Sequence, residues 1–176
     1  HLFEAAHSHG IHIQTYDDTQ VVTETENEDL YEYCRNTSMD YKIVPSIREA
    51  LTTDPYKVLA VDYQHHEPLI QFQKDISDWS QGKIDDYFSC DSLLEIIAPG
   101  ISKGNAILRL CEQLQIPLEH TISAGDADND ISMLQTTPVS VVMKNADSHM
   151  HTYATYITEH DNNHDGVAEA IYKFMI

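Results

Sequence analysis

The sequence is short of basic residues. It has ten Lys and Arg against 29 Asp and Glu, which gives a formal net charge of −19. Neutralising nucleic-acid phosphates requires clustered Lys and Arg, and these ten residues are scattered along the chain. The composition therefore argues against a nucleic-acid partner. An acidic protein that handles an anionic ligand needs local positive charge, and that charge has to be sought at individual residues.

Long apolar runs are also missing. No run approaches the roughly 20 residues of a membrane-spanning helix, and the start lacks the basic and apolar segments of a signal peptide. We therefore expect a cytoplasmic protein with no membrane partner. Cysteine is scarce as well: Cys34, Cys90 and Cys111 are widely spaced, so neither a zinc knuckle nor a disulfide framework is predicted.

The most informative stretch is residues 123–130, where carboxylates stand at alternate positions directly after an apolar run. We expect a strand that delivers Asp126, Asp128 and Asp130 to its carboxyl end, which is where ligands bind in open α/β sheets. Carboxylates this close repel one another unless a cation holds them together. Oxygen ligands without Cys or His favour Mg²⁺ over Zn²⁺.

This stretch is open to two other interpretations. Its acids have the opening spacing of an EF-hand calcium loop, but Ile131 and Thr137 stand where that loop needs Gly and Glu, so we reject a calcium loop. A solvated acidic turn that caps the next helix is the plainer alternative, because Asp and Asn are favoured caps.

A second feature is the segment 99–105, which lies between an apolar run at 93–98 and a helical pattern at 106–116. Ser102 is a good helix N-cap, and Lys103 then falls in the first turn, where the helix dipole disfavours a cation. An anion at the same helix end would explain this lysine, since helix N-termini bind phosphate. The alternative is an ordinary surface lysine.

Taken in order, strand, Ser-Lys-Gly, helix, strand, Gly-Asp-x-x-Asn-Asp and helix resemble the C-terminal half of the haloacid dehalogenase-like (HAD) hydrolases. The match is nearer to the Cof-type branch of Mg²⁺-dependent phosphatases. Three further segments resemble that branch: the strand and Met-x-Asn-Ala motif at 139–146, a strand at 154–158, and a closing segment at 162–168. The motifs cover roughly residues 93–171.

The chain departs from this family in its N-terminal motifs, and neither the nucleophile motif nor the early Ser/Thr motif that binds the transferred phosphoryl group has a clear counterpart. The family's nucleophile is the first Asp of an Asp-x-Asp-Gly-Thr motif near the N-terminus, and the sequence has no such motif. We therefore expect a fragment that lacks the N-terminal segment of its parent, has that segment as a partner, and is inactive alone.

The resemblance implies a site and a reaction. An Asp from the missing segment would attack phosphorus to form an aspartyl-phosphate, which water would hydrolyse. Asp126 would bind Mg²⁺ directly, while Asp130 and Asn129 would hold the metal's waters or the nucleophile loop. The implied substrate is a small phosphorylated metabolite such as a sugar phosphate.

Lys103 would be the catalytic cation that neutralises the phosphoryl oxygens, and Asn162 and Asp165 would support the site from the last loop. The same scaffold without a nucleophile is open to a second interpretation, a non-catalytic binding or regulatory module. A third is a phosphomutase.

The first half of the chain mixes strand and helix patterns, with strands expected at 11–16, 20–23, 56–62 and 86–90 and helices at 2–9, 27–37, 47–51 and 67–79. This mixture predicts an α+β layer with helices on one face of a mainly antiparallel sheet. We expect an α/β protein with two domains. Residues 1–92 form a separate α+β cap domain that sets substrate specificity, and residues 93–176 form part of a Rossmann-like HAD core.

Overall fold

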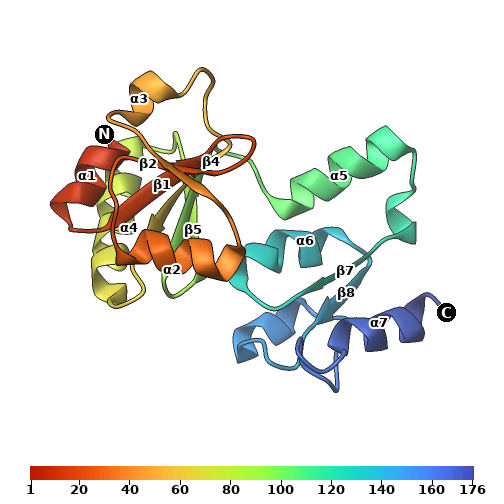
Figure 1. Ribbon diagram of the computed structural model, residues 1–176. Helices are drawn as coiled ribbons and strands as arrows, with labels where there is room; N and C mark the ends of the chain where they lie inside the picture. The colour runs from red at the N-terminus through yellow and green to blue at the C-terminus, as the bar shows by residue number, and fades with distance from the viewer. The chain divides into compact units, whose positions relative to one another are not determined.

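The computed structural model describes residues 1–176 and divides into two compact units, His1–Pro99 and Gly100–Ile176. Figure 1 labels their helices and strands. None of the helices has the length and apolar character that crossing a membrane requires.

The first unit is a six-stranded sheet with four helices. The strand order is β3-β2-β1-β4-β6-β5, in which only β2 and β3 are parallel neighbours. The predicted mainly antiparallel sheet is therefore confirmed. In chain order its elements are α1 (Leu2–Ser8), β1 (His12–Tyr16), β2 (Val21–Thr23), α2 (Glu28–Thr37), β3 (Tyr41–Ile43), α3 (Ile47–Ala50), β4 (Lys57–Val61), α4 (His66–Ser80), β5 (Asp85–Cys90) and β6 (Leu93–Ile97).

Helices cover both faces of this sheet, so the expectation of a single covered face is wrong. Val58 and Ala60 of β4 pack with α1 and α4, whereas Leu59 and Val61 of the same strand pack with α2. Successive side chains of a strand point to opposite faces, so these two clusters lie on opposite sides of the sheet. The uninterrupted apolar run of β4 is the sequence signal for such a strand.

The boundary between the two units lies after Pro99 and not before Leu93. The strand β6 was expected to open the second domain, but it pairs antiparallel with both β4 and β5 over its whole length. Its buried residues Leu94 and Ile96 belong to the core cluster of α1 and α4. An apolar strand followed by a turn and a helix is equally compatible with either unit, and only the pairing decides between them.

The second unit is a three-stranded parallel sheet of order β7-β8-β9. On one face Leu134 of α6 packs with Val142, and on the other Ala170 of α7 packs with Val141. The helix α5 lies against α6 (Figure 1). The elements are α5 (Lys103–Leu114), β7 (Ile122–Gly125), α6 (Ile131–Thr136), β8 (Val139–Val142), β9 (Tyr156–Ile157) and α7 (Gly166–Phe174), with short 3₁₀ turns at Leu118–His120, Asp128–Asp130 and Ser148–Tyr153.

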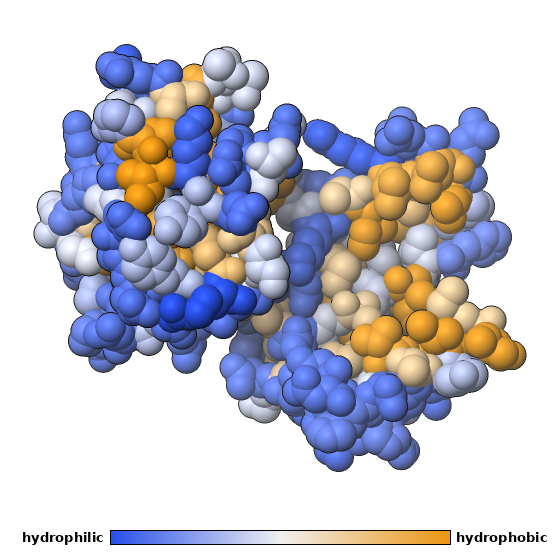
Figure 2. Space-filling model, viewed as in Figure 1, coloured by the Kyte–Doolittle hydropathy of each residue, from blue (hydrophilic) through white to orange (hydrophobic).

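The second unit leaves much apolar surface exposed on α5 and α7. Figure 2 shows this surface as one orange patch over each of the two helices. We call these residues the α5–α7 apolar patch. Its members are Leu108, Leu110 and Leu114 of α5 and Val167, Ile171 and Met175 at α7, each at least 41% exposed.

Candidate functional site

The polar residues of interest in the second unit follow the carboxyl ends of its parallel strands. Asp126 comes directly after β7, Asn145 three residues after β8, and Asn162 five residues after β9. Because parallel strands end at the same edge of a sheet, the three segments meet there.

The Asp126 carboxylate is held on one side by two amides. Its Oδ2 accepts hydrogen bonds from Asn145 Nδ2 at 3.3 Å and from Asn162 Nδ2 at 3.2 Å. The two asparagines are joined to each other, since Asn162 N donates to Asn145 Oδ1 at 3.0 Å. This closed ring fixes the orientation of the carboxylate and leaves its second oxygen, Oδ1, without a protein donor.

Asp130 is buried behind this carboxylate. Its Oδ2 accepts from Asp126 N at 3.0 Å and Ala127 N at 3.4 Å, and its Oδ1 accepts from Lys103 Nζ at 2.5 Å. The side chain of Asp130 is 8% exposed and that of Lys103 is 47% exposed. Both oxygens of Asp130 are thus occupied by protein donors, and Asp130 fixes both the turn after β7 and the ammonium group.

Lys103 is placed by the start of α5. Ser102 caps this helix, its side chain accepting from Asn105 N at 3.1 Å, and the predicted N-cap is therefore confirmed. Gly104 N donates to Ser132 Oγ at 3.2 Å. A Cβ atom on Gly104 would lie 2.4 Å from Ser132 O, so only glycine lets the first turn of α5 approach α6 this closely.

Two predicted site residues do not join this cluster. Asn129 lies in the 3₁₀ turn after β7, and the side-chain donors to Asp126 are Asn145 and Asn162 instead. Asp165 precedes α7 in a left-handed conformation with φ 65°, and its exposed side chain makes no cap hydrogen bond. Asp128 is paired with His149 at 2.5 Å, outside the ring around Asp126.

No group of three or more His, Cys, Asp or Glu side chains converges as a complete metal site. The side-chain groups around Asp126 that could serve as metal ligands are carboxylates and amides only. Such a set is compatible with a hard cation that keeps most of its water ligands and unsuited to Zn²⁺.

The family model for haloacid dehalogenase-like hydrolases matches residues 1–171. The chain belongs to this family. A relative from Streptococcus pyogenes serotype M6 is 30% identical over 176 residues, which is 95% of this chain and 61% of the relative.

Two further comparisons describe relatives of this chain. The crystal structure of a haloacid dehalogenase-like hydrolase from Bacteroides thetaiotaomicron has a TM-score of 0.86 and 30% identity, covering 99% of this chain and 65% of that one. The 5-amino-6-(5-phospho-D-ribitylamino)uracil phosphatase YcsE of Bacillus subtilis is 36% identical over 83 residues, 47% of this chain and 33% of that protein. Some curated relatives match nearly all of this chain. The chain spans about three fifths of the length of those relatives.

Asn145 is the residue that sequence reasoning did not assign to the site. Its motif, Met-x-Asn-Ala, was recognised only as a marker of the family. A usable signal was nevertheless present, because Asn145 follows a buried parallel strand as Asp126 does.

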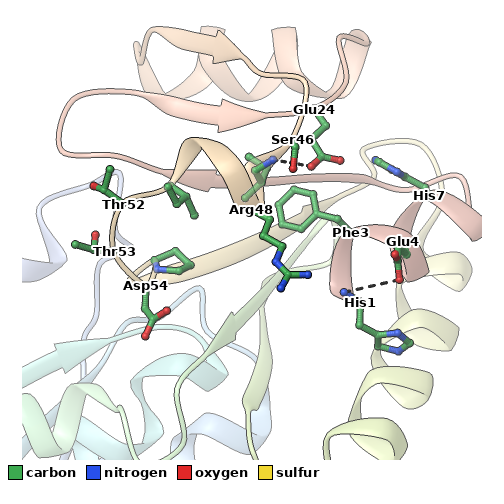
Figure 3. A pocket seen from close by; sticks show the side chains of 13 residues that line it. His1, Phe3, Glu4, His7, Glu24, Ser46, Arg48, Thr52, Thr53 and Asp54 are labelled. Atoms are coloured by element: carbon green, nitrogen blue, oxygen red, sulfur yellow. Dashed lines mark hydrogen bonds and ion pairs between the residues drawn. The ribbon is translucent and has the colours of Figure 1, made fainter.

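The first unit carries a groove of about 920 Å³ that contains none of the predicted site residues. In Figure 3 the Phe3 ring and the Arg48 side chain lie in this groove, and Glu24 accepts from Ile47 N at 2.7 Å at its wall. Hydroxyl groups of Ser46, Thr52 and Thr53 also line it.

Proposed function

We propose that this chain is part of a Mg²⁺-dependent phosphatase that hydrolyses small phosphorylated metabolites through an aspartyl-phosphate. The observation that carries the proposal is the Asp126 carboxylate, clamped at Oδ2 by two amides and open at Oδ1. Family membership and the phosphatase name of the Bacillus subtilis relative support the reaction class.

Asp126 would hold the metal ion through Oδ1. Proteins usually bind Mg²⁺ through one or two carboxylates, several waters and the substrate's phosphate oxygens, so one fixed carboxylate suits it. When bound, Mg²⁺ neutralises negative charge that develops on the phosphoryl oxygens. Asn145 and Asn162 keep the Asp126 carboxylate turned toward it, a supporting role that strongly affects metal affinity in other proteins.

Lys103 would bind the phosphoryl group beside the metal. Its ammonium lies on Asp130 Oδ1, which holds it in place before substrate binds. A preorganised cation is most effective where charge grows in the transition state. Asp130 and Asn129 are proposed as support for this arrangement, Asp130 through both its oxygens, and Asp165 as support for the last loop.

The nucleophile of the proposed reaction would come from a segment outside this sequence. Its carboxylate oxygen would form a bond to phosphorus as the ester oxygen leaves with the alcohol. Water would then attack phosphorus, release inorganic phosphate and regenerate the carboxylate.

The surface of the second unit supports a docking place for such a segment. The strand β7 is an edge strand, with β8 on one side only, and the exposed α5–α7 apolar patch lies on α7, which packs on the sheet, and on α5, which packs on α6. Unpaired edges recruit further strands, and a strand buried between two helix layers is apolar on both faces. We propose that the segment docks here as a strand beside β7.

On α7 the patch is on the side that faces away from β9. Glu169 and Lys173, on the other side of the helix, contact Tyr156 of β9 through a hydrogen bond and a cation–ring contact. Because Ala170 of α7 packs with Ile122 and Ala124 of β7, we infer that Val167 and Ile171 would contact a strand added beside β7.

The first unit is proposed to select the substrate. Its groove offers Arg48, which makes no ion pair, together with an aromatic ring and several hydroxyl groups. These groups suit the polar, non-phosphate part of a metabolite. Replacing Arg48 by Ala would then change the ranking of substrates, whereas Lys83→Ala, outside the groove, would not.

The deciding experiment measures hydrolysis of para-nitrophenyl phosphate with and without the docking segment. The part of the Streptococcus pyogenes relative that lies outside the match serves as that segment, supplied on a separate tagged chain. We expect no turnover by the chain alone and Mg²⁺-dependent turnover by the pair, abolished by Asp126→Asn. A pair that forms but has no activity toward a panel of phosphate esters would favour the non-catalytic binding module.

Docking is tested by the same mixture. Leu114→Glu and Ile171→Glu place charges in the apolar patch and should prevent co-purification of the segment. Arg109→Glu and Tyr172→Glu are matched controls, because both residues are exposed on the same helices outside the patch. Co-purification that survives the patch variants would contradict the proposed docking place, whatever the activity.

A further inference from the structure

The loop between β9 and α7, residues 158–165, carries Asn162 to Asp126. Its side chains are polar, and only Thr158 at its start is buried, so the loop has no apolar anchor. Its conformation must therefore come from hydrogen bonds.

Glu169, in the first turn of α7, supplies most of these bonds at the start of the loop. Its carboxylate accepts from Glu159 N at 2.9 Å, from His160 N at 3.1 Å and from His160 Nδ1 at 2.8 Å. It also accepts from the Tyr156 hydroxyl at 2.5 Å. One side chain thus joins the last strand, the loop and the helix.

The end of the loop is closed against its start. Gly166 N donates to Asp161 O at 3.0 Å, and the Asp161 carboxylate accepts from Asn163 N at 2.9 Å. A Cβ on Gly166 would lie 2.6 Å from His160 O, so the loop returns tightly over the first residue of α7. The chain from 159 to 166 is a compact arm with Asn162 at its tip.

We infer that Glu169 is a positioning residue for the site, because it fixes the arm that holds Asn162 against Asp126. This inference deepens the proposed function and rests on it. Glu169 touches neither Asp126 nor Asn162, and it acts through the backbone of residues 159 and 160.

The ionisation of the cluster is consistent with this role. The Tyr156 hydroxyl and the Glu159 backbone N–H lower the pKa of Glu169 to about 2, and the bond to Glu169 raises the pKa of Tyr156 to about 12. Glu169 therefore stays ionised and Tyr156 stays protonated across the neutral pH range, and the arm stays anchored over that range.

The test measures Mg²⁺ binding to the chain by isothermal titration calorimetry. The loss of a residue that orients a metal ligand typically weakens metal affinity about 10- to 100-fold. We expect Glu169→Ala to weaken Mg²⁺ binding about tenfold and Glu169→Gln, which keeps one acceptor oxygen, to weaken it less. Glu159→Ala removes a neighbouring exposed carboxylate and controls for the change in charge, and it should leave the affinity unchanged.

A double-mutant cycle separates positioning from general destabilisation. If Glu169 acts through Asn162, then Asn162→Ala should weaken binding by a similar factor and the double variant no further. Fold losses that multiply, or a Glu169→Ala variant with wild-type affinity, would overturn the inference. Wild-type Mg²⁺ affinity in Asp126→Asn, or no binding by the unmodified chain, would instead overturn the metal site and the proposed function with it.

Discussion

The Asp130 side chain packs directly against the backbone of Gly125, in the space that a larger side chain at position 125 would fill. A Cβ atom on Gly125 would lie 2.5 Å from the Cβ of Asp130 and 2.6 Å from its Oδ2. That same Oδ2 accepts the Asp126 N–H, and the other oxygen holds Lys103. The last residue of β7 must therefore be glycine for the buried carboxylate to fold back over the turn.

Gly125→Ala is expected to displace Asp130 and destabilise the second unit by about 1–3 kcal/mol, the usual range for an overpacked interior. Thermal unfolding measures the loss, and Mg²⁺ titration measures damage to Asp126. Gly100→Ala is the control, since a Cβ there meets nothing within 4 Å and only backbone strain is added. Equal Mg²⁺ affinity in both variants would contradict the proposed link between Gly125 and the site.

Lys103→Ala in the complete, active enzyme should lower kcat about 10²–10³-fold, the range found when one preorganised electrostatic contact to the transition state is lost. Lys173→Ala is the matched control, because that lysine lies in α7 over the Tyr156 ring. Steady-state kinetics would decide. Small and equal effects of the two substitutions would remove Lys103 from the proposed site.

The buried imidazole of His12 predicts a pH dependence for the first unit. Burial lowers the pKa of His12 below 6.5, partly offset by its hydrogen bond to Gln14 at 3.0 Å. Protons then bind more readily to the unfolded chain, so stability is full above pH 6.5 and is lost as pH falls toward the folded-state pKa. Urea unfolding between pH 7 and pH 5 should show this loss, and His12→Gln should reduce it.

The two units have separate apolar cores, so their stabilities should respond separately to core truncation. Phe72→Ala removes a fully buried ring from the first unit and should cost about 3–5 kcal/mol there. Met150→Ala removes a fully buried side chain from the core of the second unit and should cost about 2–5 kcal/mol there. Hydrogen exchange, measured residue by residue, should show each loss confined to its own unit. Equal deprotection of both units by either variant would mean that they unfold as one.

Local signals in the sequence were sufficient for most elements of the fold. The caps Asn27 and Ser102 each accept a hydrogen bond from the backbone three residues later, as expected from sequence. The turn at Asp17 joins an antiparallel pair of strands. Such features depend on a few neighbouring residues, so they can be predicted from the local sequence.

Features set by distant residues were not predictable in the same way. The strand β3 is only three residues long and is exposed at all three positions, so its pairing with β2 is what defines it. The assignment of β6 to the first unit likewise depends on β4 and β5. At the site, Asn162 reaches Asp126 across 36 residues, and that contact depends on how Glu169 folds the intervening loop.

The unpaired edge of β7 should affect how much of this chain accumulates when a cell produces it. A bare strand edge flanked by apolar helices is the kind of surface on which chains aggregate, and cells triage such species with chaperones and proteases. If a further segment covers the edge as proposed, the chain produced without that segment should accumulate to a lower level than the chain produced together with it. Abundance, as well as activity, would then report on complementation.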